Sequence, residues 1–251
     1  MIELLQRYCD DYSWRCKSRL GRTSWLVEDH SGQDIVIKLA CSARERFFLA
    51  NQAHWQTINA GLCANSLLRL ETFADGQVLL SRYIRGETLA DLIRQQWRGT
   101  PDYHYLSDTL SQLYKGLEQL HCNGCVHSDL KPANILYSAQ GVVFLDFASA
   151  RALKSDDRNR AFYSYSPSYS LPAQQRGSGY SKVEHDWYSF LCLVYVAMQG
   201  EQSLPDWRDD NPLAQVFDKS IERWLCCCSC VSELEGIWQW RDRLAAFTAK
   251  R

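Results

Sequence analysis

The sequence predicts an α+β fold with two lobes, in which a small strand-rich lobe with one helix precedes a larger helical lobe. Two observations predict it. Short β-branched runs and a hairpin signal fill the first third of the chain, and leucines at helical spacing dominate the rest. We expect a single domain over residues 1–251, with the small lobe at 1–84 and the larger lobe at 85–251.

Short apolar runs predict the strands of the first lobe. Residues 34–39 form a β-branched run that contains Lys38. Residues 67–73 and 77–84 flank Asp75-Gly76, a dipeptide typical of hairpin turns because the turn requires a positive φ. We therefore expect a hairpin at this point.

Capping residues and periodicity predict the helices. Ser42 and Glu45 have the spacing of a capping box, which predicts a helix that runs to about Ile58. In the second lobe, residues 187–198 are apolar on all sides, as in a helix buried within a helical lobe. An amphipathic helix that ends at Asn123-Gly124 is predicted by one apolar stripe: Leu106, Leu110, Leu113, Leu117 and Leu120. The tryptophan-containing C-terminal part is expected to be helical too.

Composition excludes some partners and compartments. The formal net charge is −1, so neither nucleic acid nor an anionic membrane is an expected partner. No apolar stretch has the roughly 20 residues of a membrane span, and the first residues lack a signal-peptide layout, so we expect a cytoplasmic protein.

Eleven cysteines, an odd number, argue against a disulfide framework. Cys122 and Cys125 have redox or zinc spacing, and Cys226 to Cys230 form a cluster, but reduced thiols packed in the interior are the simpler interpretation.

The segment around residues 127–147 carries the strongest chemical signal. It contains Asp129, Lys131 and Asn134, and Asp146 follows at the end of a predicted strand. Carboxylate and amide oxygens are ligands that Mg²⁺ prefers, so Asn134 and Asp146 are candidate metal ligands. Asp129 is a candidate general base, and Lys131, two residues on, is a candidate cation that could stabilise negative charge as it develops in a reaction. A turn in which Asp129 merely caps the backbone is the alternative for any one of these residues alone.

This segment resembles the catalytic loop and the Asp-Phe-Gly motif of eukaryotic-like serine/threonine protein kinases. The resemblance runs in register from about residue 20 to residue 200 and implies ATP- and Mg²⁺-dependent transfer of a phosphoryl group to serine or threonine of a protein substrate. Kinases of small molecules, of the aminoglycoside or choline type, seldom carry a lysine at the position of Lys131. The protein-kinase branch is therefore favoured.

The resemblance also implies nucleotide-binding residues in the first lobe. Lys38 matches the lysine that pairs with phosphates, and Gly21 lies in the loop that would cover them. Arg82 and Ile84 align with the segment that binds adenine through its backbone. The family places a glutamate opposite the lysine; here Gln52 aligns with it, and Glu45 is the alternative partner of Lys38.

Several departures indicate an atypical, compact member of this family. The phosphate-covering loop has only one glycine. Ser128 replaces the arginine that in the family binds a phosphate on the activation segment, so we expect activity that does not depend on phosphorylation of that segment. Ala148 and Ala173 replace a glycine and an acid. Compact chains of this kind resemble stand-alone bacterial kinases, including those injected into host cells, where the cluster from Cys226 to Cys230 would be a candidate acylation site. A pseudokinase that acts as a binding or scaffold module and a small-molecule or lipid kinase are the alternatives.

Overall fold

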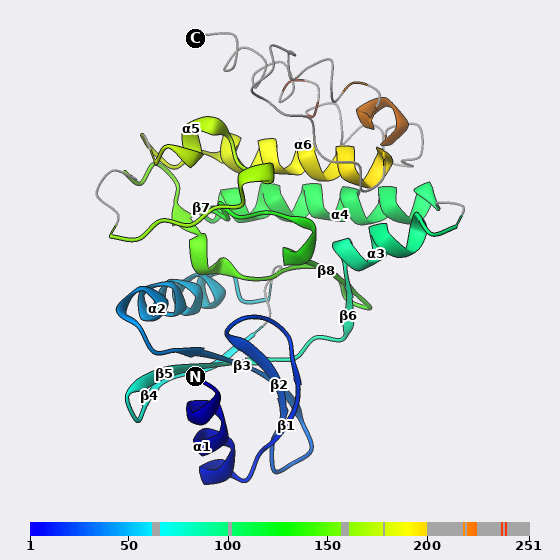
Figure 1. Cartoon of the computed structure of the whole chain (residues 1–251). Coiled ribbons are helices and arrows are strands. Elements are labelled where there is room, and N and C mark those ends of the chain that lie inside the picture. The colour runs from blue at the N-terminus through cyan, green and yellow to red at the C-terminus, as the bar shows by residue number, and fades with distance from the viewer. Residues whose placement is uncertain are drawn as a thin grey trace. The chain divides into compact units, whose positions relative to one another are not determined.

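A computed structural model describes residues 1–61, 66–99, 102–156, 161–177 and 179–199, together with 218, 220–224, 237 and 239. The chain forms two compact units (Figure 1). The first consists of Met1–Arg85 and Val143–Ala150, and the second of Gly86–Val142 and Arg151–Arg251. The first unit is rich in strands and the second is mainly helical, which confirms the predicted α+β class.

The first unit is built on a five-stranded antiparallel sheet of order β1-β2-β3-β5-β4. The prediction of strands near 34–39 and 67–73 is confirmed by β3 and β4. The strands are β1 (Arg15–Arg19), β2 (Ser24–Glu28), β3 (Asp34–Ala40), β4 (Leu67–Phe73) and β5 (Gly76–Arg82).

Helices cover both faces of this sheet. The helix α1 (Ile2–Tyr12), which the sequence did not predict, packs the apolar side of its residues 4–9 on the face that carries Ile35, Ile37 and Leu39. The helix α2 (Ala43–Ile58) packs on the opposite face, against Ala40 and Leu79. Because side chains alternate along a strand, Lys38 points to the α2 side.

The predicted capping box at the start of α2 is confirmed. The Ser42 hydroxyl accepts a hydrogen bond from the Glu45 amide at 3.2 Å, and the Glu45 carboxylate accepts one from the Ser42 amide at 3.1 Å. These bonds satisfy amides that the first turn of a helix leaves without partners. They also lower the pKa of Glu45, chiefly through the Ser42 amide.

The β4–β5 hairpin is confirmed, but the reason for its glycine differs from the one expected. The positive φ of the turn, 51°, falls on Ala74 rather than on Asp75 or Gly76. A Cβ at Gly76 would instead lie 2.5 Å from Leu4 Cδ2 and 3.2 Å from the Ala40 carbonyl oxygen. Gly76 therefore permits the close approach of α1, a contact that no local pattern reveals.

The second unit is built around two long helices that lie side by side in Figure 1, α4 (Tyr103–Cys122) and α6 (Val183–Gln199). The five leucines of the predicted stripe in α4 are all fully buried, and α4 ends before Gly124, whose φ is 71°. Trp224 is also fully buried and forms an edge contact with Phe190 of α6. The other tryptophans of the expected C-terminal helices, and the cluster from Cys226 to Cys230, lie outside the described residues.

Shorter elements complete the second unit. The chain passes from the second unit into the first within β9 (Gly141–Phe144), and the short strands β7 (Cys125–Val126) and β10 (Arg151–Ala152) pair with each other. None of the helices within the described residues is long and apolar enough to cross a membrane. These elements are β6 (Gly86–Thr88), α3 (Leu89–Gln96), β7 (Cys125–Val126), η1 (Pro132–Asn134), β8 (Ile135–Ser138), β9 (Gly141–Phe144), β10 (Arg151–Ala152), η4 (Pro167–Tyr169) and α5 (Pro172–Gln175).

Asp186, in the first turn of α6, anchors the loop that follows β7. Its carboxylate is fully buried and accepts hydrogen bonds from the backbone amides of His127 at 2.7 Å and Ser128 at 2.8 Å. His121 Nε2 lies 3.0 Å from the same carboxylate. Burial alone would raise the pKa of Asp186, but His121, the charge of His127 and the Ser128 amide together lower it.

We expect Tyr8→Ala to destabilise the first unit, because Tyr8 is fully buried between α1 and the sheet. Its hydroxyl donates to the Glu71 carboxylate and accepts from Arg69, and burial raises the pKa of the phenol. Loss of a buried aromatic side chain costs about 3–5 kcal/mol of unfolding free energy. Chemical denaturation measures it, with Arg7→Ala on the exposed side of α1 as the control. Equal losses in the two variants would show that α1 is not part of the folded core.

Asp186→Asn should destabilise the protein by roughly 3 kcal/mol at neutral pH, because it removes a charge that buried donors surround. The folded pKa of Asp186 lies below the ordinary 3.8, so this stabilisation is present above that pH and is lost as the pH falls through the folded pKa. The difference in melting temperature between the wild type and the variant should therefore stay constant from pH 7 to about pH 4 and shrink only as the pH falls further. The control is Asp108→Asn, at an exposed acid on α4; curves that stay parallel down to pH 3 would refute the assignment.

Candidate active site

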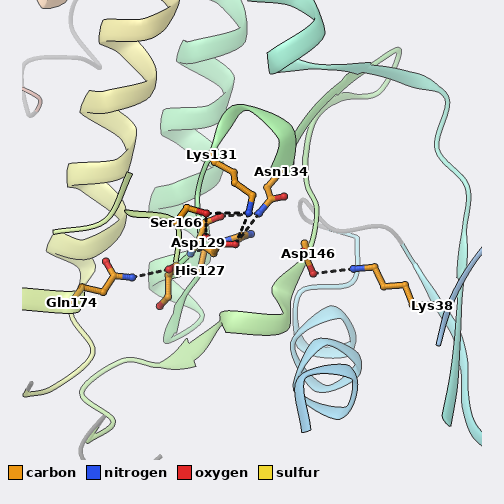
Figure 2. A network of polar contacts seen from close by, with 9 residues as sticks. Lys38, His127, Asp129, Lys131, Asn134, Asp146, Ser166 and Gln174 are labelled. Carbon is orange, nitrogen blue, oxygen red and sulfur yellow. Dashed lines mark hydrogen bonds and ion pairs between the residues drawn. The ribbon is translucent and has the colours of Figure 1, made fainter. Parts of the chain in front are cut away.

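In the first unit, Lys38 lies between two acceptors. Its Nζ donates to Gln52 Oε1 of α2 at 2.7 Å and to Asp146 Oδ1 at 2.9 Å, the contact drawn in Figure 2. Glu45, the alternative partner, is instead held in the capping box, with Arg22 3.8 Å away. Lys38 therefore has one charged acceptor, Asp146, and one neutral acceptor, Gln52, which stands where the family resemblance places a glutamate.

Asp146 has an unusual backbone. Its φ and ψ are 61° and 64°, in the left-handed region, and the short turn η2 (Phe147–Ser149) follows at once. Aspartate tolerates this region better than most residues. The side chain of Asn51, on α2, donates to the carbonyl oxygens of Ala148 at 2.9 Å and Ala150 at 2.8 Å. The segment after Asp146 is thus held by the helix that also carries Gln52.

In the second unit, polar side chains gather around Asp129 (Figure 2). Lys131 Nζ donates to Asp129 Oδ2 at 3.0 Å, and the hydroxyl of Ser166 donates to Oδ1 at 2.6 Å. Lys131 also donates to Ser166 Oγ at 3.1 Å. Asn134 Nδ2 donates to the Asp129 carbonyl oxygen at 2.8 Å, which directs its amide oxygen away from the loop. A carboxylate, an alcohol and an ammonium group therefore meet at one point.

Ser128 adopts a left-handed backbone, with a φ of 67°. Its carbonyl oxygen accepts a hydrogen bond at 2.7 Å from the buried Gln174 side chain, while its amide is held by Asp186. Tyr163 donates to the Gln174 carbonyl oxygen, and the Arg151 guanidinium stacks 4.9 Å from the centre of the Tyr163 ring. Hydrogen bonds between uncharged groups, together with one cation–π contact, thus connect the segment 163–175 to the loop that carries Asp129.

The remaining predicted nucleotide-binding residues lie on the first unit. Gly21 is in the β1–β2 turn, where its carbonyl oxygen accepts from Arg19 Nε at 2.9 Å, and its φ is not positive. Arg82 ends β5 with an exposed side chain, and its amide donates to the Ser66 carbonyl oxygen at 3.0 Å. Ile84 is half-buried in the segment that follows. No contact within this part of the structure assigns a ligand to these three.

Asn134 in the second unit and Asp146 in the first unit each carry a side-chain oxygen, the hard type of ligand that Mg²⁺ prefers. Mg²⁺ commonly takes one or two carboxylates and completes its shell with water and phosphate oxygens. Among the described residues, no group of three or more His, Cys, Asp or Glu could hold a metal by itself.

Sequence reasoning did not select several residues of these networks, among them Asn51, Ser166, Tyr163 and Gln174. Ser166 lies in a stretch rich in serine and tyrosine, so nothing in its neighbours singles it out. Asn51 directly precedes Gln52, and its three acceptors are 96 to 99 residues away. Of these residues, only Asn51 could have been found from the sequence, because it is the polar neighbour of Gln52, which aligns with the glutamate of the family.

Comparison with known proteins supports the same chemistry. The family model of the protein kinase domain matches residues 44–241. The chain is 28% identical over 88% of its length to a probable serine/threonine-protein kinase PknB of Bifidobacterium longum, of which it covers 32%. It is 29% identical over 55% of its length to serine/threonine-protein kinase PknB of Mycobacterium tuberculosis, covering 22%, and 28% identical over 59% to human ribosomal protein S6 kinase alpha-2, covering 21%.

The chain thus spans a third or less of the length of these curated relatives. The match to the family model covers most of the chain and includes α2, the loop of Asp129 and the Asp146 segment. Together with the strand-rich first unit and the helical second unit, it shows that this chain belongs to the protein kinase domain family, in the branch of the eukaryotic-like serine/threonine kinases.

Proposed function

We propose that this protein transfers the γ-phosphoryl group of ATP to serine or threonine hydroxyls of protein substrates, with Mg²⁺ as cofactor. The observation that carries the proposal is the arrangement at Asp129, whose carboxylate accepts a hydrogen bond from an alcohol at 2.6 Å with the Lys131 ammonium 3.0 Å away. A hydroxyl nucleophile needs an acceptor for its proton and a cation near the phosphate that it attacks.

In the proposed reaction, the substrate hydroxyl oxygen forms a bond to the γ-phosphorus while the bond to the bridging oxygen of ADP breaks. The hydroxyl proton passes to the Asp129 carboxylate, and Lys131 stabilises the negative charge on the transferring group. Lys38 would bind phosphate oxygens through its ammonium, and Asn134 and Asp146 would supply oxygens to Mg²⁺. The bound ion would neutralise charge on the phosphates.

The β1–β2 turn that contains Gly21 would cover the phosphates, and backbone groups near Arg82 and Ile84 would bind adenine. Gln52 would orient Lys38 through their 2.7 Å hydrogen bond. We propose one kinase domain over residues 1–251, with lobes at 1–84 and 85–251.

A reducing, cytoplasmic location is part of this proposal. The six cysteines within the described residues are reduced thiols, as is usual for proteins of reducing compartments: Cys9, Cys16, Cys41, Cys122, Cys125 and Cys192.

Asp129→Ala should abolish phosphoryl transfer, because the hydroxyl proton then has no acceptor. Loss of a general base costs about 10²–10⁴-fold in rate. Binding of Mg²⁺–ATP, measured as a rise in melting temperature, should persist because Asp129 is not a proposed metal ligand. The control is Asp108→Ala, an exposed acid in the same unit. Undiminished transfer by the Asp129 variant would remove the proposed base.

Phosphatase treatment should leave the activity unchanged, because the segment 163–175 is tied to the catalytic loop through Tyr163, Gln174 and Ser128 rather than through a phosphate. Phosphorylated residues are mapped by mass spectrometry before and after treatment, and activity is measured on both samples. Tyr163→Phe, which removes the hydroxyl bonded to the Gln174 carbonyl, should lower the activity, and Tyr165→Phe is the matched control. Activity that disappears with dephosphorylation would overturn this part of the proposal.

A further inference from the structure

Asn51 makes a set of contacts that the proposed chemistry does not yet use. It lies within α2, half-buried, and its side-chain amide donates toward three backbone carbonyl oxygens: Ala150 at 2.8 Å, Ala148 at 2.9 Å and Phe147 at 3.3 Å. All four residues belong to the first unit. One side-chain amide therefore contacts three of the four carbonyl oxygens of residues 147–150, which form the turn η2 and the residue after it.

The segment needs such a cap. Asp146 has a left-handed backbone, a conformation that costs about 1–3 kcal/mol and persists only where surrounding contacts determine it. Within the turn itself the Ala150 amide bonds to the Phe147 carbonyl oxygen at 3.0 Å. A single short turn is weak by itself, so contacts from outside must hold Asp146 in this conformation.

The position of Asp146 depends on two neighbouring residues of α2. Gln52 accepts a hydrogen bond from Lys38, whose ammonium also binds Asp146, while Asn51 binds the backbone that follows Asp146. Gln52 is neutral, and hydrogen bonds to a neutral group are weaker than those to a carboxylate. The route from Gln52 through Lys38 to the Asp146 side chain is therefore weaker than it would be with a glutamate. The hydrogen bonds from Asn51 to the backbone after Asp146 then contribute a larger share of the contacts between α2 and this segment.

Local helix stability does not explain Asn51. Asparagine is a poor helix former in the interior of a helix and alanine is the best one. A residue chosen only to stabilise α2 would not be asparagine, and Asn51→Ala would then raise stability slightly. The contacts that favour asparagine at this position are those to residues 147–150.

We propose that Asn51 is a positioning residue, which holds residues 147–150 so that the carboxylate of Asp146 faces Lys38 and is available to a phosphate-bound Mg²⁺ ion. The part that concerns Mg²⁺ rests on the proposed kinase function. The part that concerns the bracing of the segment stands on the hydrogen bonds alone.

Three full-length variants test the inference. Asn51→Ala removes the amide, and Asn51→Asp keeps the shape but places carboxylate oxygens against three carbonyl oxygens. The matched control is Asn59→Ala, at the end of the same helix. The Asn59 side chain donates at 2.9 Å to the Trp55 carbonyl oxygen, so its loss removes a side-chain amide whose acceptor lies within α2 itself.

Hydrogen exchange of the Ala150 amide, without nucleotide, measures the bracing directly. Asn51→Ala should speed exchange roughly tenfold, the change that about 1.4 kcal/mol produces, Asn51→Asp should speed it further, and Asn59→Ala should leave it unchanged. Unchanged exchange in Asn51→Ala, or equal acceleration in the control, would overturn the inference.

Binding of ATP at increasing Mg²⁺, followed by thermal shift, then measures the consequence for the metal. The Mg²⁺ concentration for half-maximal stabilisation should rise about tenfold in Asn51→Ala and stay constant in Asn59→Ala. Faster exchange with an unchanged Mg²⁺ requirement would refute the positioning role. If the wild type binds Mg²⁺–ATP but transfers no phosphoryl group, the proposed function fails while these two measurements still decide the role of Asn51.

Discussion

The loop that carries the proposed catalytic base depends on one buried carboxylate. Asp186 holds the amides of His127 and Ser128 at the start of α6, and Ser128 takes up a left-handed backbone in the same place. Asp129 follows directly and meets Lys131, Asn134 and Ser166. A buried charge is expensive unless hydrogen bonds surround it, so the loop and the helix determine each other's position. The site chemistry of the second unit rests on this anchor.

The first unit uses a different device. Its sheet is covered on one face by α1 and on the other by α2, so the strand that carries Lys38 is packed from both sides. Gln52 provides a neutral acceptor for Lys38, and Asp146 provides the charged one. The charge on the lysine is thus balanced by the same carboxylate that is the proposed metal ligand, and a bound Mg²⁺ would compete for it.

Local patterns in the sequence predicted much of this fold. The capping box at Ser42, the leucine stripe of α4, the hairpin strands and the buried α6 all depend on neighbours in sequence, and the structure has them. The helix α1 was missed because its apolar side is short and is buried only by packing on a sheet whose strands come later in the chain. The same limit applies to Asn51 and Gln174, whose acceptors lie 97 and 46 residues away.

The protein kinase fold is compatible with catalysis and with binding alone, so the decisive question is whether phosphoryl groups reach protein. The measurement is incubation with γ-labelled ATP and a cell extract, followed by identification of the labelled amino acids. The account predicts label on serine and threonine of extract proteins, dependent on Mg²⁺ and on this protein. Label confined to small molecules, or no transfer above background although Mg²⁺–ATP binds, would contradict it.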